Sequence, residues 1–160
     1  GRNHQQIIPH AGSTFFLGEL LLDIELEYDI EQQNRCGTCH RCIDSCPTDA
    51  LHCNQEIDAN RCLSYLTIEN RREIPDEFGK KMGNYIYGCD RCIRSCPWSR
   101  FASPTTEPQQ QPTEGLFKLT KEQWNNLTIE EYRRIFKKSA VKRAKYEGLM
   151  RNIRAINKKD

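Results

Sequence analysis

The nine cysteines constrain this chain of 160 residues more than any other feature. Four of them lie in the run CGTCHRCIDSCP, which starts at Cys36 and has the spacing CxxCxxCxxxCP. A shortened copy, CDRCIRSCP, starts at Cys89 and lacks one cysteine, which Cys62 upstream in NRCLSY can replace. Bacterial proteins use this run to hold iron–sulfur clusters. The internal repeat therefore predicts two [4Fe-4S] sites.

The spacing also predicts how the cysteines are shared between the two sites. In such runs the first three cysteines wrap around one cluster, while the cysteine before the proline reaches the other. The first cluster is therefore expected to be bound by Cys36, Cys39, Cys42 and Cys96. The second is expected to be bound by Cys46, Cys62, Cys89 and Cys92. Pro47 and Pro97 should redirect the chain after each motif, because proline fixes φ.

Two other uses of the cysteines fit the spacing less well. Zinc sites usually use isolated CxxC pairs, and four cysteines in one run would crowd a tetrahedral ion. Disulfides are disfavoured because cysteines two residues apart seldom pair and nothing indicates secretion. The ninth cysteine, Cys53, is expected to be a small buried residue without a redox role.

The composition is typical of a protein that does not enter a membrane. Hydrophobic residues make up 37% of the chain, and its longest apolar stretch, FFLGELLL, contains Glu19. That stretch is far shorter than the ~20 residues that cross a bilayer. No signal peptide is recognisable, and the start at Gly1 without Met suggests a processed chain or a fragment.

The predicted fold is α+β and mostly helical, in four parts. Residues 1–34 include GSTFFLGELLLDIELEYD, in which partial alternation predicts one or two strands. Residues 35–101 form a two-cluster core like that of bacterial ferredoxins, with a short helix after each CP pair. Residues 102–117, rich in proline and glutamine, are a linker. Residues 118–160 form a helical extension.

Capping residues indicate where several helices begin. Asp58 is a good N-cap for the helix that carries Cys62. Thr128 and Glu131 form a capping box for a second helix in the extension. A third runs from about Ser139 to Asn157 and has an apolar stripe at helical spacing.

Charge is divided unequally along the chain. Residues 1–117 contain 11 Lys and Arg against 17 Asp and Glu, a net charge of −6, whereas residues 118–160 contain 13 against 5, a net charge of +8. A basic helix beside an acidic core suggests a polyanionic partner such as RNA, although a solvated helix face is the plain alternative. The candidate RNA-binding residues are Lys142, Arg143, Lys145, Arg151 and Arg154.

Four stretches resemble one enzyme family. CGTCHRCIDSCPTDAL, DANRCLSYLTIE, MGNYIYGCDRCIRSCPW and SAVKRAKYEGLMRN together look like the C-terminal half of epoxyqueuosine reductase. GRNH at the start is similar to a family segment that commonly reads GKNT, so Arg2 and His4 depart from the pattern. The resemblance covers nearly the whole chain.

The resemblance implies a function in tRNA modification. The family reduces the epoxide of epoxyqueuosine to queuosine with cobalamin and two [4Fe-4S] clusters. It implies that Asn3, Ser64 and Tyr65 lie against cobalamin, and that the cobalamin domain and its catalytic acid lie upstream, so no catalytic residue is assigned here. We also expect tRNA as a partner, a flavodoxin- or ferredoxin-like one-electron donor, a monomer and a cytoplasmic location.

Three alternatives remain open on the sequence. A stand-alone ferredoxin-like carrier would share both cysteine motifs but would not need the basic tail. The cluster module of a reductive dehalogenase would be similar, without a surface for tRNA. A nucleic-acid-binding zinc protein is the alternative without redox chemistry.

Overall fold

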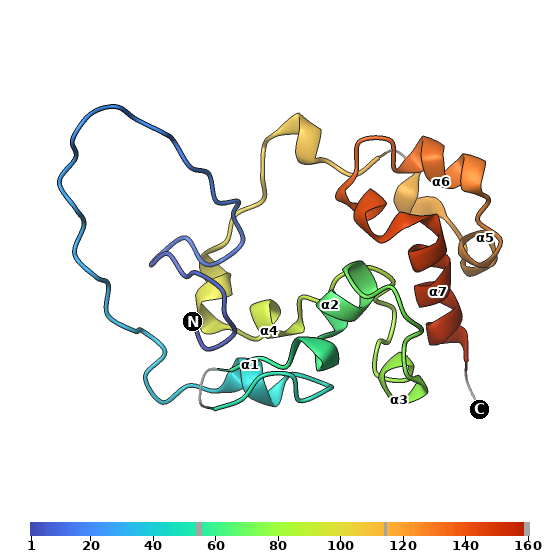
Figure 1. Ribbon diagram of the computed structural model, residues 1–160, viewed down its shortest axis with the longest axis horizontal. Helices are drawn as coiled ribbons and strands as arrows, with labels where there is room; N and C mark the ends of the chain where they lie inside the picture. Colours follow the sequence, from blue (N-terminus) through green and yellow to red (C-terminus); the bar gives the residue numbers. More distant parts are fainter. Residues whose placement is uncertain (54–55, 114, 159–160) are drawn as a thin grey trace.

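The computed structural model describes residues 1–53, 56–113 and 115–158 and consists mainly of short helices joined by loops (Figure 1). Its α-helices are α1 (Arg41–Asp44), α2 (Leu63–Ile68), α3 (Asp76–Gly79), α4 (Arg91–Arg94), α5 (Lys121–Asn125), α6 (Ile129–Ile135) and α7 (Lys145–Asn157). Its 3₁₀ helices are η1 (Ala59–Arg61), η2 (Pro97–Phe101), η3 (Pro108–Gln110), η4 (Leu116–Lys118) and η5 (Ala140–Ala144). The prediction of a mostly helical chain is confirmed. None of the described helices is both long and apolar enough to cross a membrane.

The N-terminal strands are not confirmed. Residues 16–29 belong to a wide arc that lies away from the helices (Figure 1), and Leu21 and Tyr28 are almost completely exposed. Alternating residue types favour an extended backbone, but a strand also needs a neighbour for its N–H and C=O groups. Within the described ranges the β contacts are limited to two isolated bridges, Ile8 with Gly12 and Leu51 with Ile57.

The two cysteine motifs form a pair of single-turn helices. α1 contains Cys42, α4 contains Cys92, and the two helices pack against each other. After the second motif, Pro97 opens η2, as expected. After the first, the chain turns at Pro47 instead of forming a helix, so only one of the two predicted helices after the CP pairs is present.

The helix predicted to start near Asp58 has the expected cap but is broken in the middle. The Asp58 carboxylate accepts a hydrogen bond from the backbone N–H of Asn60 at 3.0 Å. Cys62 then adopts an extended backbone (φ −71°, ψ 116°), which separates η1 from α2. The break leaves Cys62 as the N-cap of α2.

The C-terminal extension is helical, as predicted. The capping box of α6 is confirmed, because Thr128 Oγ1 accepts from Glu131 N at 3.2 Å while the Glu131 carboxylate accepts from Thr128 N at 2.9 Å. The third predicted helix is divided into η5 and α7. The division falls at Lys145, whose φ of 62° is uncommon for a residue other than glycine.

Two apolar clusters hold the fold together, and α7 contributes to both. The first contains Leu63, Leu66, Ile74, Phe78, Met82 and Ala155. The second contains Leu127, Tyr132, Ile135, Phe136, Leu149 and Ile153. Because α7 supplies Ala155 to one and Leu149 and Ile153 to the other, it joins the extension to the segments that carry Cys62 and Cys89.

Candidate metal centre

Four cysteines from both motifs surround one cavity of about 220 Å³. They are the residues predicted to bind the first cluster, Cys36, Cys39, Cys42 and Cys96. The first three come from the loop before α1 and from α1 itself, whereas Cys96 follows α4. Burial raises the pKa of the Cys42 thiol, and the nearby thiols of Cys36 and Cys96 add to the increase. The structure thus brings together cysteines that the sequence separates by more than fifty positions.

The other four predicted ligands form a second group. Burial raises the pKa of the Cys89 thiol, with further contributions from Cys62 and Cys46. The pKa of the Cys92 thiol is raised to about 11, first by burial and then by four neighbouring thiols, those of Cys89, Cys62, Cys42 and Cys46. Cys46 and Cys62 are therefore near enough to Cys89 and Cys92 to affect their pKa values, and Cys42 is near enough to affect that of Cys92.

A pair of serines connects the two motifs. Ser45 and Ser95 occupy the same position, directly before the cysteine of each CP pair, and their hydroxyl oxygens are 2.9 Å apart. Each hydroxyl also lies within hydrogen-bonding distance of a carbonyl in its own motif, Cys42 O at 3.0 Å and Cys92 O at 3.2 Å. This symmetric contact holds α1 against α4 and so fixes the spacing between the two cysteine groups.

The Cys46 sulfur has hydrogen-bond donors within its own loop. The backbone N–H of Ala50 donates to the sulfur at 3.3 Å, and the hydroxyl of Thr48, which is completely buried, lies 3.7 Å from it. Such donors stabilise negative charge on a thiolate and tune the reduction potential of a cluster that it binds.

The donor set fits a cluster better than a single ion. Among residues 1–53, 56–113 and 115–158, no three His, Cys, Asp or Glu side chains are close enough together to hold one metal ion. Zinc would need its four ligands within ~2.3 Å of one point. Four thiols spread around a cavity suit an iron–sulfur cage, in which each thiolate binds a different iron atom.

The ninth cysteine is not buried, contrary to our expectation. Cys53 lies in a turn shortly after the bridged Leu51 and is exposed. A turn leaves a small side chain in solvent even when its type is usually found inside.

This exposure predicts an order of alkylation. In the cluster-free chain at about pH 7.5, Cys53 should react with iodoacetamide first. Cys92 should react last, because its raised pKa leaves almost no thiolate at that pH. With clusters bound, Cys53 alone should react quickly. Peptide mass spectrometry over time measures both orders, and equal rates at Cys53 and Cys92 in the cluster-free chain would contradict the prediction.

The segment that carries both cysteine motifs, and the chain as a whole, match known proteins. Residues 35–99 match the family model of a 4Fe-4S double cluster binding domain. An epoxyqueuosine reductase from Leadbetterella byssophila is 48% identical over 153 residues, which are 96% of this chain and 50% of that protein. The structure of epoxyqueuosine reductase from Streptococcus thermophilus has 32% sequence identity and a TM-score of 0.79, and the match covers 98% of this chain and 41% of that one.

A further match is the crystal structure of an epoxyqueuosine reductase with a tRNA-Tyr epoxyqueuosine-modified tRNA stem loop. It has 30% identity and a TM-score of 0.73, and the match covers 81% of this chain and 34% of that one. Over nearly its whole length, the chain matches the C-terminal portion of epoxyqueuosine reductases. It spans about half the length of the curated epoxyqueuosine reductases that it matches. The ferredoxin-carrier and reductive-dehalogenase alternatives are not favoured by these matches.

The residues that the epoxyqueuosine reductase resemblance assigned to cobalamin lie in two places: Ser64 and Tyr65 follow Cys62 of the second cysteine group, whereas Asn3 lines the cavity of the first group and reaches Cys92 of the second. Asn3 is buried, and its amide nitrogen donates to the carbonyl of Cys92 at 3.3 Å while its oxygen accepts from Gln5 N. Ser64 and Tyr65 lie on α2, two and three positions after Cys62, and Tyr65 is 38% exposed. Tyr65 is therefore open to a partner, whereas both polar atoms of Asn3 are used within the chain.

The basic residues are divided between surface and interior. Lys142, Lys145 and Arg154 are exposed. Arg143 is exposed too, but its guanidinium pairs with Glu69. Arg151 is only 6% exposed, and its donors are directed at backbone carbonyls and at Asn152. Burial therefore removes Arg151 from the candidate RNA-binding set.

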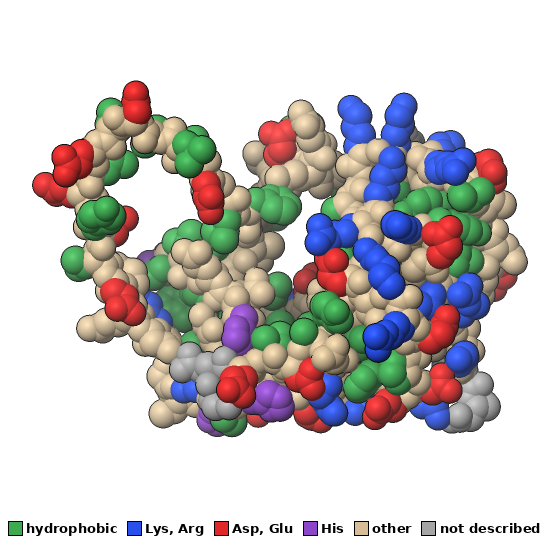
Figure 2. Space-filling model, in the orientation of Figure 1, with side chains coloured by type: hydrophobic (Ala, Val, Ile, Leu, Met, Phe, Trp, Pro, Cys, Tyr) green, Lys and Arg blue, Asp and Glu red, His purple; other side chains and the backbone are tan. Residues whose placement is uncertain are grey.

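Four exposed cations were not among the candidate RNA-binding residues predicted from the sequence. Buried and exposed residues alternate on α6 and just after it. The exposed ones are Arg133, Arg134, Lys137 and Lys138, and the buried ones are Tyr132, Ile135 and Phe136. The charge count of residues 118–160 included them, and the amphipathic spacing could have assigned them to the outer face. Figure 2 shows Lys and Arg side chains gathered over the region of α6, η5 and the start of α7. We call Arg133, Arg134, Lys137, Lys138, Lys142 and Lys145 the basic surface.

Proposed function

We propose that this chain is the electron-delivering part of an epoxyqueuosine reductase, which reduces epoxyqueuosine to queuosine in tRNA together with an upstream cobalamin domain. The observation that supports this proposal is that four cysteines from both motifs line one cavity within a segment that matches a double-cluster domain. The first [4Fe-4S] cluster would be held by Cys36, Cys39, Cys42 and Cys96. The second would be held by Cys46, Cys62, Cys89 and Cys92. The core is proposed to be ferredoxin-like.

The role of the chain is to hold two redox groups at a fixed separation. A bound [4Fe-4S] cluster accepts and releases one electron at a time. The Ser45–Ser95 contact keeps α1 against α4, and the Ala50 N–H stabilises the negative charge of the Cys46 thiolate. The electrons would come from a flavodoxin- or ferredoxin-like donor. No residue of this chain is assigned a role in proton transfer to the epoxide.

The side of the second cysteine group is proposed to face the cobalamin. Tyr65 and Ser64 follow Cys62 on α2, and the exposed Tyr65 ring offers a surface for a large planar ring system. Asn3 would hold this side in place through its hydrogen bond to Cys92 O. Cobalamin, when bound, supplies the reducing centre for the epoxide.

The basic surface is proposed to bind the tRNA. Its six cations are exposed and lie on α6, on η5 or directly next to them. Phosphate neutralisation by Lys and Arg supplies most of the affinity of proteins for nucleic acids. Arg154, also exposed, extends the candidate set along α7, whereas Arg143 would support the surface by holding η5 on α2. A cytoplasmic, monomeric enzyme is part of the proposal, and cysteines that bind clusters instead of forming disulfides suit a reducing compartment.

Metal analysis of the anaerobically purified full-length enzyme tests this proposal. We expect about eight iron and eight sulfide per chain, together with one cobalamin. Reduction with dithionite should give two electron paramagnetic resonance (EPR) signals, and the reduced enzyme should convert epoxyqueuosine in a tRNA stem loop. Zinc in a colourless preparation without iron would refute the proposal. Iron without cobalamin, and without activity on the stem loop, would instead favour a stand-alone electron carrier.

A further inference from the structure

Two buried polar residues of α7 are directed at the segments that carry the second cysteine group. Arg151 is 6% exposed and Asn152 is completely buried. A guanidinium is costly to bury unless its donors are satisfied. Here they are satisfied by backbone: Arg151 donates to Leu66 O and Arg72 O, both at 2.9 Å, and to Asn70 O. Arg151 thus binds the C-terminal end of α2 and the turn after it.

Asn152 connects that end of α2 to a second segment. Its amide nitrogen donates to Thr67 O at 2.8 Å and to Ile86 O at 2.9 Å. Its amide oxygen accepts from Arg151 Nη2 at 2.8 Å and from Nε at 3.1 Å, which fixes the orientation of the amide. One side chain therefore holds together two stretches of backbone that are separated by about twenty residues in the sequence.

Thr67 makes the same connection from the side of α2. Its hydroxyl donates to Leu63 O at 2.7 Å and accepts from the backbone N–H of Gly88 at 2.9 Å, and the residue is completely buried. Gly88 has φ +72°, a conformation that suits glycine, and directly precedes Cys89. Since α2 begins directly after Cys62, the Thr67–Gly88 hydrogen bond links the helix that follows Cys62 to the residue that precedes Cys89.

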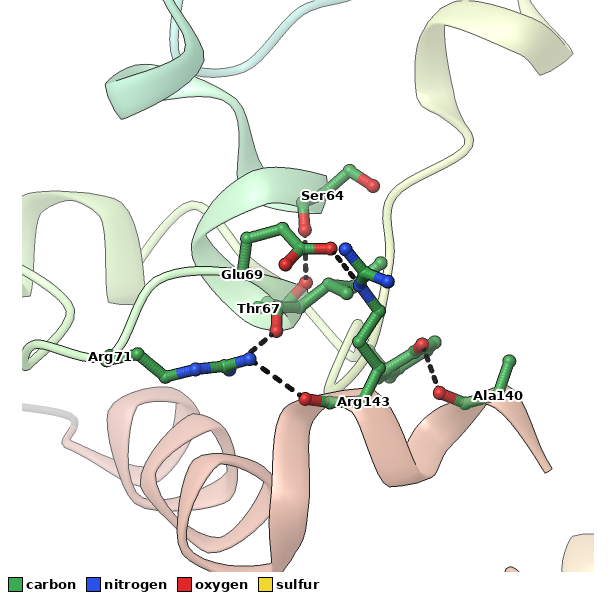
Figure 3. Close-up of polar contacts among 8 residues, drawn as sticks. Ser64, Thr67, Glu69, Arg71, Ala140 and Arg143 are labelled. Carbon is green, nitrogen blue, oxygen red and sulfur yellow. Dashed lines mark hydrogen bonds and ion pairs between the residues drawn. The ribbon is translucent and has the colours of Figure 1, made fainter. Parts of the chain in front are cut away.

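At the surface, three further contacts join α2 and the 86–88 segment to the C-terminal extension. Figure 3 shows Glu69 paired with Arg143, and Arg71 reaching the carbonyl of Arg143 at 3.0 Å. The Tyr87 hydroxyl donates to Ala140 O at 2.7 Å. The C-terminal extension therefore holds α2 and the 86–88 segment both from the interior and from the surface.

We propose that Arg151 and Asn152 are positioning residues for the second cluster, acting through Thr67 and Gly88 on the separation of Cys62 from Cys89. The extension is then part of the scaffold of that cluster as well as the carrier of the basic surface. The first cysteine group depends on other contacts, because α1 packs on α4 and its cavity is lined by residues of the N-terminal segment. The inference rests on the proposed two-cluster function.

Isosteric substitutions in the full-length enzyme test this role. Thr67→Val keeps the shape but leaves the Gly88 N–H without an acceptor, whereas Thr67→Ser keeps the hydroxyl. Asn152→Asp keeps the acceptor for Arg151 but sets a carboxylate against two carbonyls, and Asn157→Asp is the same change at an exposed position of α7. The readouts are iron per chain, the EPR spectrum and the reduction potential of each cluster. Cys39→Ser and Cys62→Ser variants assign the two signals.

We expect Thr67→Val and Asn152→Asp to lose about half of the iron, or to shift the potential of the second cluster alone. Thr67→Ser and Asn157→Asp should retain both clusters and both potentials. Folded Thr67→Val and Asn152→Asp variants with both signals unchanged would overturn the inference and leave the proposed function intact. Equal loss of both clusters would also overturn it, because it would mean a general role in stability. An unsubstituted enzyme without iron would refute the proposed function itself.

Discussion

Replacing Cys96 by alanine should remove the same cluster as replacing Cys39, although the two residues belong to different motifs. Cys96 lines the cavity that contains Cys36, Cys39 and Cys42, so its loss leaves that site with three thiolates. Each variant is expected to lose about four of eight iron atoms and the same EPR signal. The measurement is iron content and EPR of anaerobically purified full-length enzyme.

The reciprocal variants complete the test. Cys46→Ala should match Cys62→Ala, because the Cys46 thiol lies with Cys62, Cys89 and Cys92. Cys53→Ala is the matched control, since Cys53 is exposed and outside both groups, and it should retain both clusters. If Cys96→Ala instead removed the signal that Cys62→Ala removes, each motif would bind its own cluster and the crossed assignment would be wrong.

That Cys36, Cys39, Cys42 and Cys96 line one cavity could be predicted from the sequence because it depends on local geometry. Two-residue separations and a following helical turn dictate which cysteines of a motif share one side, and the repeat supplies the partner motif. Asp58 and Thr128 were predictable for the same reason, because a cap involves only residues up to three positions apart. The break at Cys62 was not, since it is set by the extended backbone of one residue between two helices.

Features that depend on distant partners could not be predicted in this way. An alternating pattern at residues 12–29 indicates extended backbone but cannot supply the neighbouring strand. The stripe of α7 contains Leu149 and Ile153, and Asn152, three positions after Leu149, could have been assigned to the same buried face. Arg151 carries a charge that suggested the surface, and its burial is explained by the carbonyls at the end of α2 and in the turn after it, together with the Asn152 amide oxygen.

Charge reversal on the basic surface should weaken tRNA binding in the full-length enzyme. We choose Lys142→Glu with Lys145→Glu, because both side chains are exposed, Lys142 on η5 and Lys145 as the first residue of α7. Leaving two phosphates without a cation and adding repulsion should reduce affinity about tenfold or more near physiological salt. The plot of log K against log salt concentration should also become shallower, by about 0.7–0.9 for each phosphate that is no longer neutralised. Fluorescence anisotropy with a labelled stem loop measures both.

The salt dependence distinguishes a binding surface from a merely solvated one. Lys81→Glu is the matched control, because Lys81 is exposed after α3, outside the basic surface, and should leave both affinity and slope unchanged. Arg143→Glu is unsuitable as a first test, since it would set two carboxylates together at Glu69 and could release η5 from α2. Unchanged affinity and slope in the Lys142/Lys145 variant would mean that these side chains contact solvent alone. A lower affinity with the parent slope would point to damage in the fold, because a protein that neutralises fewer phosphates must release fewer counterions.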